Sequence, residues 1–406
     1  MWQLLKDLII KHIQNIIKMN VGILTFHRSI NYGAFMQAYS LSNEIRTRFG
    51  DVVEIIDFEL EKKHEAYKNL QSGIKSYVIY GGKYNKKYQK FQDDLSLLPL
   101  SSESLITNDY DKVFDYINGR YDIIIVGSDA IWAYNKSLGL KNPYWLFGDK
   151  LKCIKMSYAA SAYSLDVRNV PQEDKDYIAD CLKSFTYIGV RDAETYNFIK
   201  LTNPKFCVHY NCDPTVLLPK PDKNIAEKTL KHKGINLRKK LICEMIGYNK
   251  YIPLIEKILS KKEYEFINVH RRNLPTDCLK LCKNKFLGDL SPYEWYHIYG
   301  CMFLNFTNLF HGTLLGLKSN VPTFSFDSTK FSYEYLSKIR QVLTDMNLSE
   351  FWFDNNNKSK EQEDLVLSQV EYAVKNNDAI RQKIEQNMTK EQQKSESFFE
   401  CLKSII

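Results

Sequence analysis

The chain has 406 residues, enough for two domains of ordinary size, and its 44% of hydrophobic residues can supply a core for each. The net charge of +8 comes from dispersed lysines, without an arginine-rich block or a nucleic-acid-binding motif, so a nucleic-acid partner is not expected. Nine cysteines, an odd number without a secretory signal before them, indicate reduced thiols and a cytoplasmic protein. No apolar run is long enough to cross a bilayer.

Residues 1–18 have the pattern of an amphipathic helix. Trp2, Leu5, Leu8 and Ile9 share one side, and most of the polar residues lie elsewhere. Two interpretations stay open. The helix either lies peripherally on the inner face of the membrane, or packs on a neighbouring helix or a second subunit.

The first half begins with a βαβ pattern, which is typical of a parallel sheet. The predicted elements are a strand at Val21–Thr25, a helix at Ala34–Arg48 and a strand at Val52–Phe58. Residues 60–105, rich in Lys and Tyr, interrupt the alternation as an insertion, either a lid that contacts substrate or solvated outer helices. The pattern then resumes with strands at Asp122–Val126, Lys155–Ser157 and Tyr187–Val190, and a helix at Glu194–Lys200.

A linker with Pro219 and Pro221 separates this half from a second α/β pattern. Its predicted elements are strands at Leu241–Met245, Tyr264–His270, Met302–Asn305 and Pro322–Phe326, and helices at Ile252–Ser260, after Ser291 and from Phe310 to Lys318. The sequence therefore predicts an α/β protein with an amphipathic helix at 1–18, Rossmann-like domains at 19–218 and 224–345, and a helical tail at 346–406. In such sheets ligands bind at the carboxyl ends of the strands.

Short motifs at these strand ends resemble those of the polysaccharide pyruvyl transferase family. The motifs are Asn31-Tyr32-Gly33-Ala34-Phe35-Met36-Gln37-Ala38-Tyr39, Val126-Gly127-Ser128-Asp129-Ala130-Ile131-Trp132, Gly189-Val190-Arg191-Asp192, Asp213-Pro214-Thr215 and Thr307-Asn308-Leu309-Phe310-His311-Gly312-Thr313. Each motif is weak alone, but their order along about 300 residues makes the joint signal strong. Two departures are Leu309, where small or polar residues are common, and Asp327-Ser328-Thr329-Lys330, where many members have a tighter Asp-Pro-Lys.

The resemblance implies a glycosyltransferase-B-like arrangement of the two domains, in which the tail can pack back on the N-terminal domain. It implies phosphoenolpyruvate as donor, a sugar acceptor that is polymeric or lipid-linked, and a pyruvate ketal as product. No metal or redox cofactor is expected, because the reaction needs only cations for the donor's two anionic groups and an acid near its methylene carbon. The acceptor sugar and the oligomeric state stay undetermined.

His311 and Arg191 are the principal candidates on the donor side. His311 stands where a strand meets a helix, so its imidazolium can bind an anion, donate a proton or both. Arg191 closes an apolar strand, and its guanidinium suits a carboxylate or phosphate. By resemblance Lys330 is the second donor-binding cation, with Lys318 or Arg272 as alternatives, and Gly312 and Thr313 would also contact the donor.

The acceptor side is assigned to loops of the first domain. Asn31, Tyr32 and Asp129 lie there, and Asp129 either accepts protons from sugar hydroxyls or caps its loop. Candidates of lower rank are His27, Arg28 and His270. Two rival functions remain: a nucleotide-sugar-dependent glycosyltransferase of the same architecture, and a non-catalytic scaffold of glycan assembly.

Overall fold

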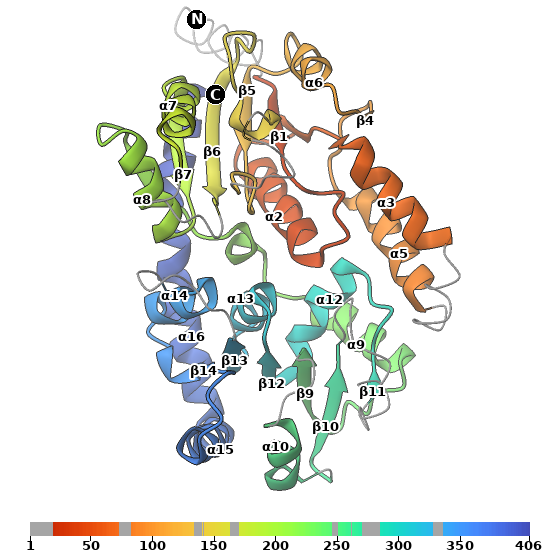
Figure 1. Ribbon diagram of the computed structural model, residues 1–406. Helices are drawn as coiled ribbons and strands as arrows, with labels where there is room; N and C mark the ends of the chain where they lie inside the picture. Colours follow the sequence, from red (N-terminus) through yellow and green to blue (C-terminus); the bar gives the residue numbers. More distant parts are fainter. Residues whose placement is uncertain are drawn as a thin grey trace, which may run out of the picture.

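The computed structural model describes residues 19–72, 83–133, 140, 142–162, 170–245, 251–260, 262–269, 285–327 and 336–406. These residues form two halves, each built around a parallel sheet, with the carboxyl ends of both sheets directed toward the boundary between the halves (Figure 1). Residues 1–18, which carry the two interpretations of the N-terminal helix, lie outside the described residues. Within the described ranges, no helix is both long and apolar enough to span a membrane.

The first sheet has the strand order β2-β1-β5-β6-β7-β8 among the described residues. Its strands are β1 (Val21–Leu24), β2 (Val53–Ile55), β5 (Ile123–Val126), β6 (Ile154–Ala160), β7 (Phe185–Val190) and β8 (Val208–Tyr210). The helices of this half are α2 (Tyr32–Phe49), α3 (Glu61–Ser72), α5 (Lys83–Asp94), α6 (Tyr110–Ile117), α7 (Gln172–Leu182) and α8 (Ala193–Thr202). Successive residues of β5 alternate between two apolar clusters, Ile123 and Ile125 in one and Ile124 and Val126 in the other. Both faces of this sheet are therefore buried, as expected for a parallel sheet.

The second sheet repeats the plan with the order β11-β10-β9-β12-β13-β14. Its strands are β9 (Lys240–Met245), β10 (Tyr264–Asn268), β11 (Lys285–Phe286), β12 (Met302–Thr307), β13 (Thr323–Asp327) and β14 (Trp352–Asp354). Its helices are α9 (Lys223–His232), α10 (Ile252–Ile258), α12 (Pro292–Ile298), α13 (Phe310–Lys318) and α14 (Lys338–Asp345). The predicted helix start at Ser291 is confirmed as a capping box with Glu294.

Each sheet has a switch point where the strand order reverses, between β1 and β5 in the first and between β9 and β12 in the second. Loops diverge at such a point and leave a crevice at the carboxyl edge. The loop after β5 carries Asp129, and the loop after β12 leads into His311. The topology thus directs two of the predicted site residues toward the cleft from opposite halves.

The helical tail comprises α15 (Lys360–Lys375), α16 (Asn377–Gln393) and α17 (Glu396–Ile405). It begins in the second half, and α17 ends against β7 of the first sheet. Phe398 is fully buried there, with its ring 4.8 Å from that of Tyr158 and 5.4 Å from that of Tyr187. Ser395, at the start of α17, hydrogen-bonds the Tyr158 hydroxyl at 2.7 Å. The tail therefore links the second half to the core of the first.

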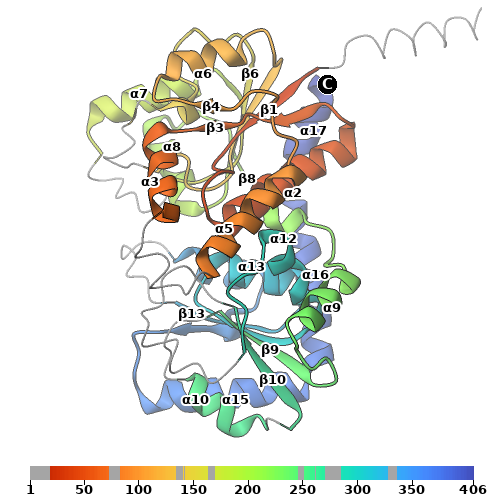
Figure 2. The same ribbon diagram turned by 90° about the vertical axis from the view of Figure 1, so that its right-hand side faces the viewer.

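A second link joins the halves near the cleft, where α5 of the first half meets α12 of the second (Figure 2). Lys90 forms an ion pair with Glu294 at 2.6 Å. The Tyr293 backbone N–H donates to the Asp94 carboxylate at 2.8 Å. Part of the 60–105 insertion thus contacts the second half and is not wholly directed to solvent.

Two elements differ from the sequence analysis. The single strand predicted at Val52–Phe58 is divided into β2 and β3 (Phe58–Glu59), and β3 pairs with β4 (Leu105–Ile106) in a separate two-stranded sheet. The chain bends between them because Asp57 binds the His27 and Arg28 side chains and so leaves the main sheet. Strand β14 belongs to the second sheet although the sequence analysis placed residues 346–406 in the tail.

The packing of α17 predicts a large stability effect at Phe398. Phe398→Ala removes a fully buried ring and is expected to lower the free energy of unfolding by about 3–5 kcal/mol. Urea unfolding followed by circular dichroism measures the change. Leu365→Ala on α15, where the side chain is 49% exposed, is the control and is expected to stay within about 0.5 kcal/mol of the wild type. Equal losses in both variants would contradict the described anchoring of the tail.

Candidate active site between the two halves

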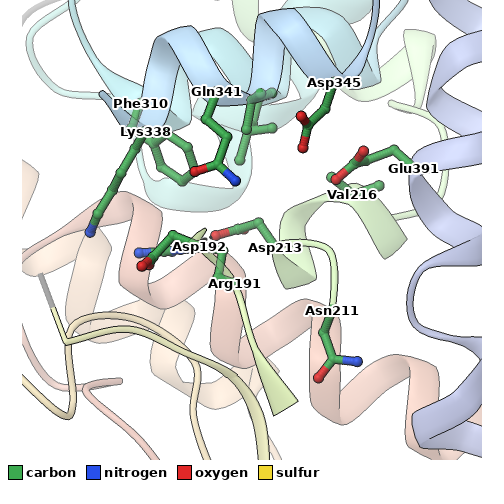
Figure 3. Close-up of a pocket in the computed structure, with 12 residues that line it drawn as sticks. Arg191, Asp192, Asn211, Asp213, Val216, Phe310, Lys338, Gln341, Asp345 and Glu391 are labelled. Carbon is green, nitrogen blue, oxygen red and sulfur yellow. Dashed lines mark hydrogen bonds and ion pairs between the residues drawn. The ribbon is translucent and has the colours of Figure 1, made fainter. Parts of the chain in front are cut away.

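A pocket of about 20 Å³ lies between the halves, with walls from the loops after β7 and β8 and from α13, α14 and α16. It is lined by Arg191, Asp192, Asn211, Asp213, Val216, Phe310, Leu314, Lys338, Gln341, Val342, Asp345 and Glu391 (Figure 3). Charged residues from both halves thus meet in a space that holds about one water molecule. One end holds Arg191 and Lys338 together with the carboxylates of Asp192 and Asp213, and the other contains Asp345 and Glu391, both paired with Lys394.

Asp213 is the central acceptor of the site. Its Oδ2 accepts hydrogen bonds from Arg191 Nη1 and from Gln37 Nε2, both at 2.6 Å. Its Oδ1 accepts from the Thr215 backbone N–H at 3.0 Å and the Thr215 hydroxyl at 2.7 Å. Burial opposes ionisation, but Arg191, His311 and the Thr215 hydrogen bonds outweigh it and hold the pKa of Asp213 below its ordinary value. Asp213 is therefore a buried carboxylate fixed by partners from several segments.

Arg191 follows β7 and is held in one orientation. Its ion pair with Asp213 is almost completely buried, and the face of its guanidinium lies over the Phe310 ring at 4.9 Å. The nearest oxygen of Asp129 is 3.9 Å from its Nη2. Within the described residues its buried Nε has no hydrogen-bond partner. This buried N–H is thus unsatisfied in the described part of the chain.

His311 lies in the first turn of α13 and faces the first half. Its Nε2 is 3.9 Å from Asp213 Oδ2 and has no hydrogen-bond partner in the described part of the chain. The other side of the ring packs against Gly33, where a Cβ atom would lie 1.9 Å from His311 Nδ1. Glycine at position 33 is what allows α2 to approach so closely. Sequence analysis had assigned no role to this contact.

The charge state of His311 depends on its neighbours. Burial is the largest effect and lowers the pKa of the imidazole, and Arg191 and Lys338 act in the same direction. Asp213 and Asp129 oppose this by stabilising the imidazolium. The neutral ring is therefore favoured while no anion occupies the pocket. An anion bound beside it would raise the pKa again.

Lys338, like Asp213, is a site residue that sequence reasoning missed. It begins α14, whose N-cap Ser337 accepts a hydrogen bond from the Arg340 backbone N–H at 3.1 Å. Its side chain extends from α14 toward Arg191 (Figure 3). Burial, and next the nearby Arg191 charge, lower the pKa of Lys338 to about 8. The signal in the sequence was the Ser337 N-cap that follows β13, which marks a helix start at the cleft edge.

The other donor-side candidates are placed differently. Thr313 is fully buried, and its hydroxyl bonds Leu309 O at 3.1 Å and Ser325 Oγ at 2.9 Å. The Gly312 carbonyl accepts from Asn305 Nδ2 at 3.0 Å. Lys318 stands seven residues after His311, about 10 Å further along α13. Lys330, Arg272 and His270 lie outside the described residues.

Two of the acceptor-side candidates, Asn31 and Tyr32, stand at the start of α2. Asn31 caps this helix by accepting the Gly33 backbone N–H at 3.0 Å. The Tyr32 hydroxyl donates to the Leu290 carbonyl of the second half. Asp129 is partly exposed and has a φ of 78°, beside Arg191. Of these three, Asp129 is the one that the structure brings to the charged site.

His27 and Arg28 follow β1 and share a partner in Asp57. His27 is fully buried, with its Nε2 2.9 Å from Asp57 Oδ1. Burial opposes ionisation of Asp57, but the hydrogen bonds from Arg28 and His27 prevail and hold its pKa well below the usual range. These contacts stabilise the bend between β2 and β3. In the ranges that the structure describes, no three His, Cys, Asp or Glu residues are arranged to hold a metal ion.

Comparison with solved structures identifies the architecture. UDP-GlcNAc 2-epimerase from Neisseria meningitidis, bound to UDP-GlcNAc, matches with a TM-score of 0.57 and 10% identity, over 95% of this chain and 99% of that one. A glycosyltransferase from Rickettsia africae matches with a TM-score of 0.54 and 11% identity, over 95% and 99%. A third match is a putative UDP-N-acetylglucosamine 2-epimerase from Listeria monocytogenes, with a TM-score of 0.53 and 10% identity over 96% of each chain. The predicted glycosyltransferase-B-like arrangement of two α/β units is confirmed.

Sequence comparison identifies the family. The family model for polysaccharide pyruvyl transferases matches residues 31–329, which include every motif quoted above. The chain therefore belongs to the polysaccharide pyruvyl transferase family. No curated protein matches it in sequence.

The geometry of His311 predicts a depressed pKa that depends on Asp213. Histidine NMR of the whole chain, with His311→Gln to assign the resonance, is expected to give a pKa below the ordinary 6.5. Asp213→Asn removes the nearest negative charge and is expected to lower that pKa further. A His311 pKa below 6.5 in the folded protein means that the unfolded chain binds more protons at this residue once the pH falls below 6.5. His311 is therefore expected to lower the free energy of unfolding as the pH falls from 6.5. A His311 pKa above 6.5 in the donor-free protein would contradict the described burial.

Proposed function

We propose that the protein transfers a pyruvyl group from phosphoenolpyruvate to a sugar of a cell-surface polysaccharide or its lipid-linked precursor, and forms a pyruvate ketal. Family membership supports the transfer of pyruvyl groups in polysaccharide synthesis. The observation that carries the proposal is that Arg191 and Lys338 line one pocket between the halves, while His311 stands beside it with its Nε2 3.9 Å from Asp213. Phosphoenolpyruvate carries a phosphate and a carboxylate, so it requires several cations and one acid.

Arg191 and Lys338 are proposed to hold the two anionic groups of the donor. Arg191 is paired with Asp213 through Nη1, and its unpartnered Nε is proposed to donate to the donor molecule. Lys338 supplies a second positive charge from α14. Lys330 remains a proposed donor ligand on the resemblance alone, as do Gly312 and Thr313. For Thr313 the hydroxyl contacts with Leu309 and Ser325 favour a supporting role.

His311 is proposed as the acid. Donor binding places negative charge beside its ring, which raises the imidazole pKa so that the ring takes up a proton. Transfer of that proton from Nε2 to the methylene carbon leaves an oxocarbenium-like centre at the neighbouring carbon. One sugar hydroxyl adds there and gives up its proton, phosphate departs, and a second hydroxyl adds with loss of its proton. The sum is one ketal and one inorganic phosphate for each donor.

The acceptor is proposed to lie on the first half, near Asp129. This carboxylate stands beside Arg191 and is partly exposed, so it is in place to accept a proton from an attacking hydroxyl. Asn31 and Tyr32 are proposed to border the acceptor. Their described contacts with Gly33 and Leu290 also give them a part in joining the two halves.

The proposal is tested by incubating the full chain with phosphoenolpyruvate and candidate glycans, including lipid-linked ones, and detecting pyruvylated product by mass spectrometry. His311→Gln is expected to abolish the product and the accompanying phosphate release, because the acid is lost. His232→Gln, on the exposed surface of α9, is the matched control and should retain full turnover. Turnover of UDP-GlcNAc in place of phosphoenolpyruvate, or equal product from His311→Gln, would refute the assignment.

Donor affinity provides a separate prediction. Lys338→Met removes one charge-assisted contact and is expected to weaken phosphoenolpyruvate binding by about 2–5 kcal/mol in calorimetry. Arg191→Lys keeps a cation beside Asp213 but loses the paired N–H groups of the guanidinium. The affinity for phosphoenolpyruvate is therefore expected to fall about tenfold. Lys375→Met, on the exposed side of α15, should bind as the wild type does. Unchanged affinity in Lys338→Met together with a loss in Lys330→Met would assign the second cation to Lys330 instead.

A further inference from the structure

A second pocket lies at the opposite end of the second sheet from the candidate active site. Its volume is about 340 Å³, and it is lined by the first residues of β9 and β12 together with α9 and α16. Strand β12 begins at this pocket and ends near His311. Six residues of strand separate the two sites by roughly 20 Å. We call this second pocket, which Lys223, Lys239, Lys240 and Arg381 border, the basic groove. It is distinct from the cleft.

The lining of the basic groove is strongly positive. Lys223, Lys239, Lys240 and Arg381 border it, against Glu227 alone. Glu227 is already paired with Lys231 of the same helix at 3.1 Å. Across the described ranges, Lys223, Lys240 and Arg381 form no ion pair with a carboxylate. The positive charge is thus not neutralised by these parts of the protein.

Two of the cations are held in place before any ligand arrives. The Arg381 Nε donates to Asn377 Oδ1 at 2.7 Å, and its Nη2 donates to the Met302 carbonyl at 2.6 Å. Lys240 Nζ lies 4.7 Å from the centre of the Phe303 ring. Fixed cations lose less conformational entropy on binding than free ones do. Burial also lowers the pKa of Arg381, so this guanidinium stands to gain from an anionic partner.

We propose that the basic groove is a binding site for a phosphate-bearing ligand, up to the size of a sugar diphosphate. Lys223, Lys240 and Arg381, which form no ion pair with a carboxylate of the described ranges, border one concavity and concentrate anions there. The volume lies at the lower end of the range for small-ligand pockets, about 300–1,000 Å³. Phe303 at the wall adds apolar surface beside these cations. The inference rests on these contacts alone and is independent of the reaction proposed above.

Calorimetric titration with pyrophosphate tests the site on the full chain. Lys338→Met serves as the background, because it removes a cation that lines the pocket in the cleft. On this background, Lys240→Gln and Arg381→Gln are each expected to weaken binding about tenfold or more, and added salt should weaken it further. Lys228→Gln, an exposed lysine on α9 that does not line the groove, is the matched control and should change binding less than about twofold. The Lys240 variant decides the matter if Arg381→Gln fails to fold, since Lys240 is exposed.

A second experiment, vesicle flotation, distinguishes a lipid headgroup from a free phosphate compound as the ligand. Flotation with phosphatidylcholine vesicles that contain phosphatidic acid, abolished by Lys240→Gln and by competing pyrophosphate, would assign the groove to a lipid headgroup. Pyrophosphate binding without flotation would assign it to a free phosphate compound. Either result supports the site. No binding of either probe, or binding that Lys240→Gln and Lys228→Gln leave equally unaffected, overturns it.

Discussion

The Asp213 carboxylate accepts hydrogen bonds from Arg191 and Gln37 at Oδ2 and from Thr215 at Oδ1. His311 of the second half has its Nε2 3.9 Å from Oδ2. A buried carboxylate is tolerated only when such partners replace the water it has lost. Removing it would leave the Arg191 charge buried without its partner and His311 without its nearest counter-charge. The geometry of the site in both halves therefore depends on this one ionised group.

Around Asp213 stand three basic side chains together with the carboxylates of Asp129 and Asp192. Arg191, Lys338 and His311 stand close enough that the pKa values of Lys338 and His311 are depressed by burial and by neighbouring cations. Such an arrangement is unfavourable in itself and becomes favourable when a dianion enters. A donor that carries both phosphate and carboxylate meets this condition. The electrostatics thus agree with the proposed function, in which donor binding is proposed to protonate His311.

Contacts between the halves fix the width of the cleft. Gly33 lets the His311 ring pack directly on α2, Tyr32 reaches the Leu290 carbonyl, and Lys90 pairs with Glu294. The tail adds a covalent connection that ends with Phe398 in the core of the first half. These links lie on several sides of the cleft, so the two sheets are held to one another by more than the linker at Pro219.

The sequence by itself determined the two α/β patterns, the family and most strand ends, because hydrophobic period and turn residues are local properties. It also determined that His311 and Arg191 follow buried strands, and a strand's carboxyl end in a parallel sheet faces the ligand edge. It did not separate β2 from β3, since the bend depends on the binding of Asp57 by His27 and Arg28. Only the tertiary structure decided that Lys338 shares a pocket with Arg191, and that Asp213 joins residues 37, 191 and 311. Those groups are far apart in the chain, and their meeting depends on how the two halves pack, which no local pattern records.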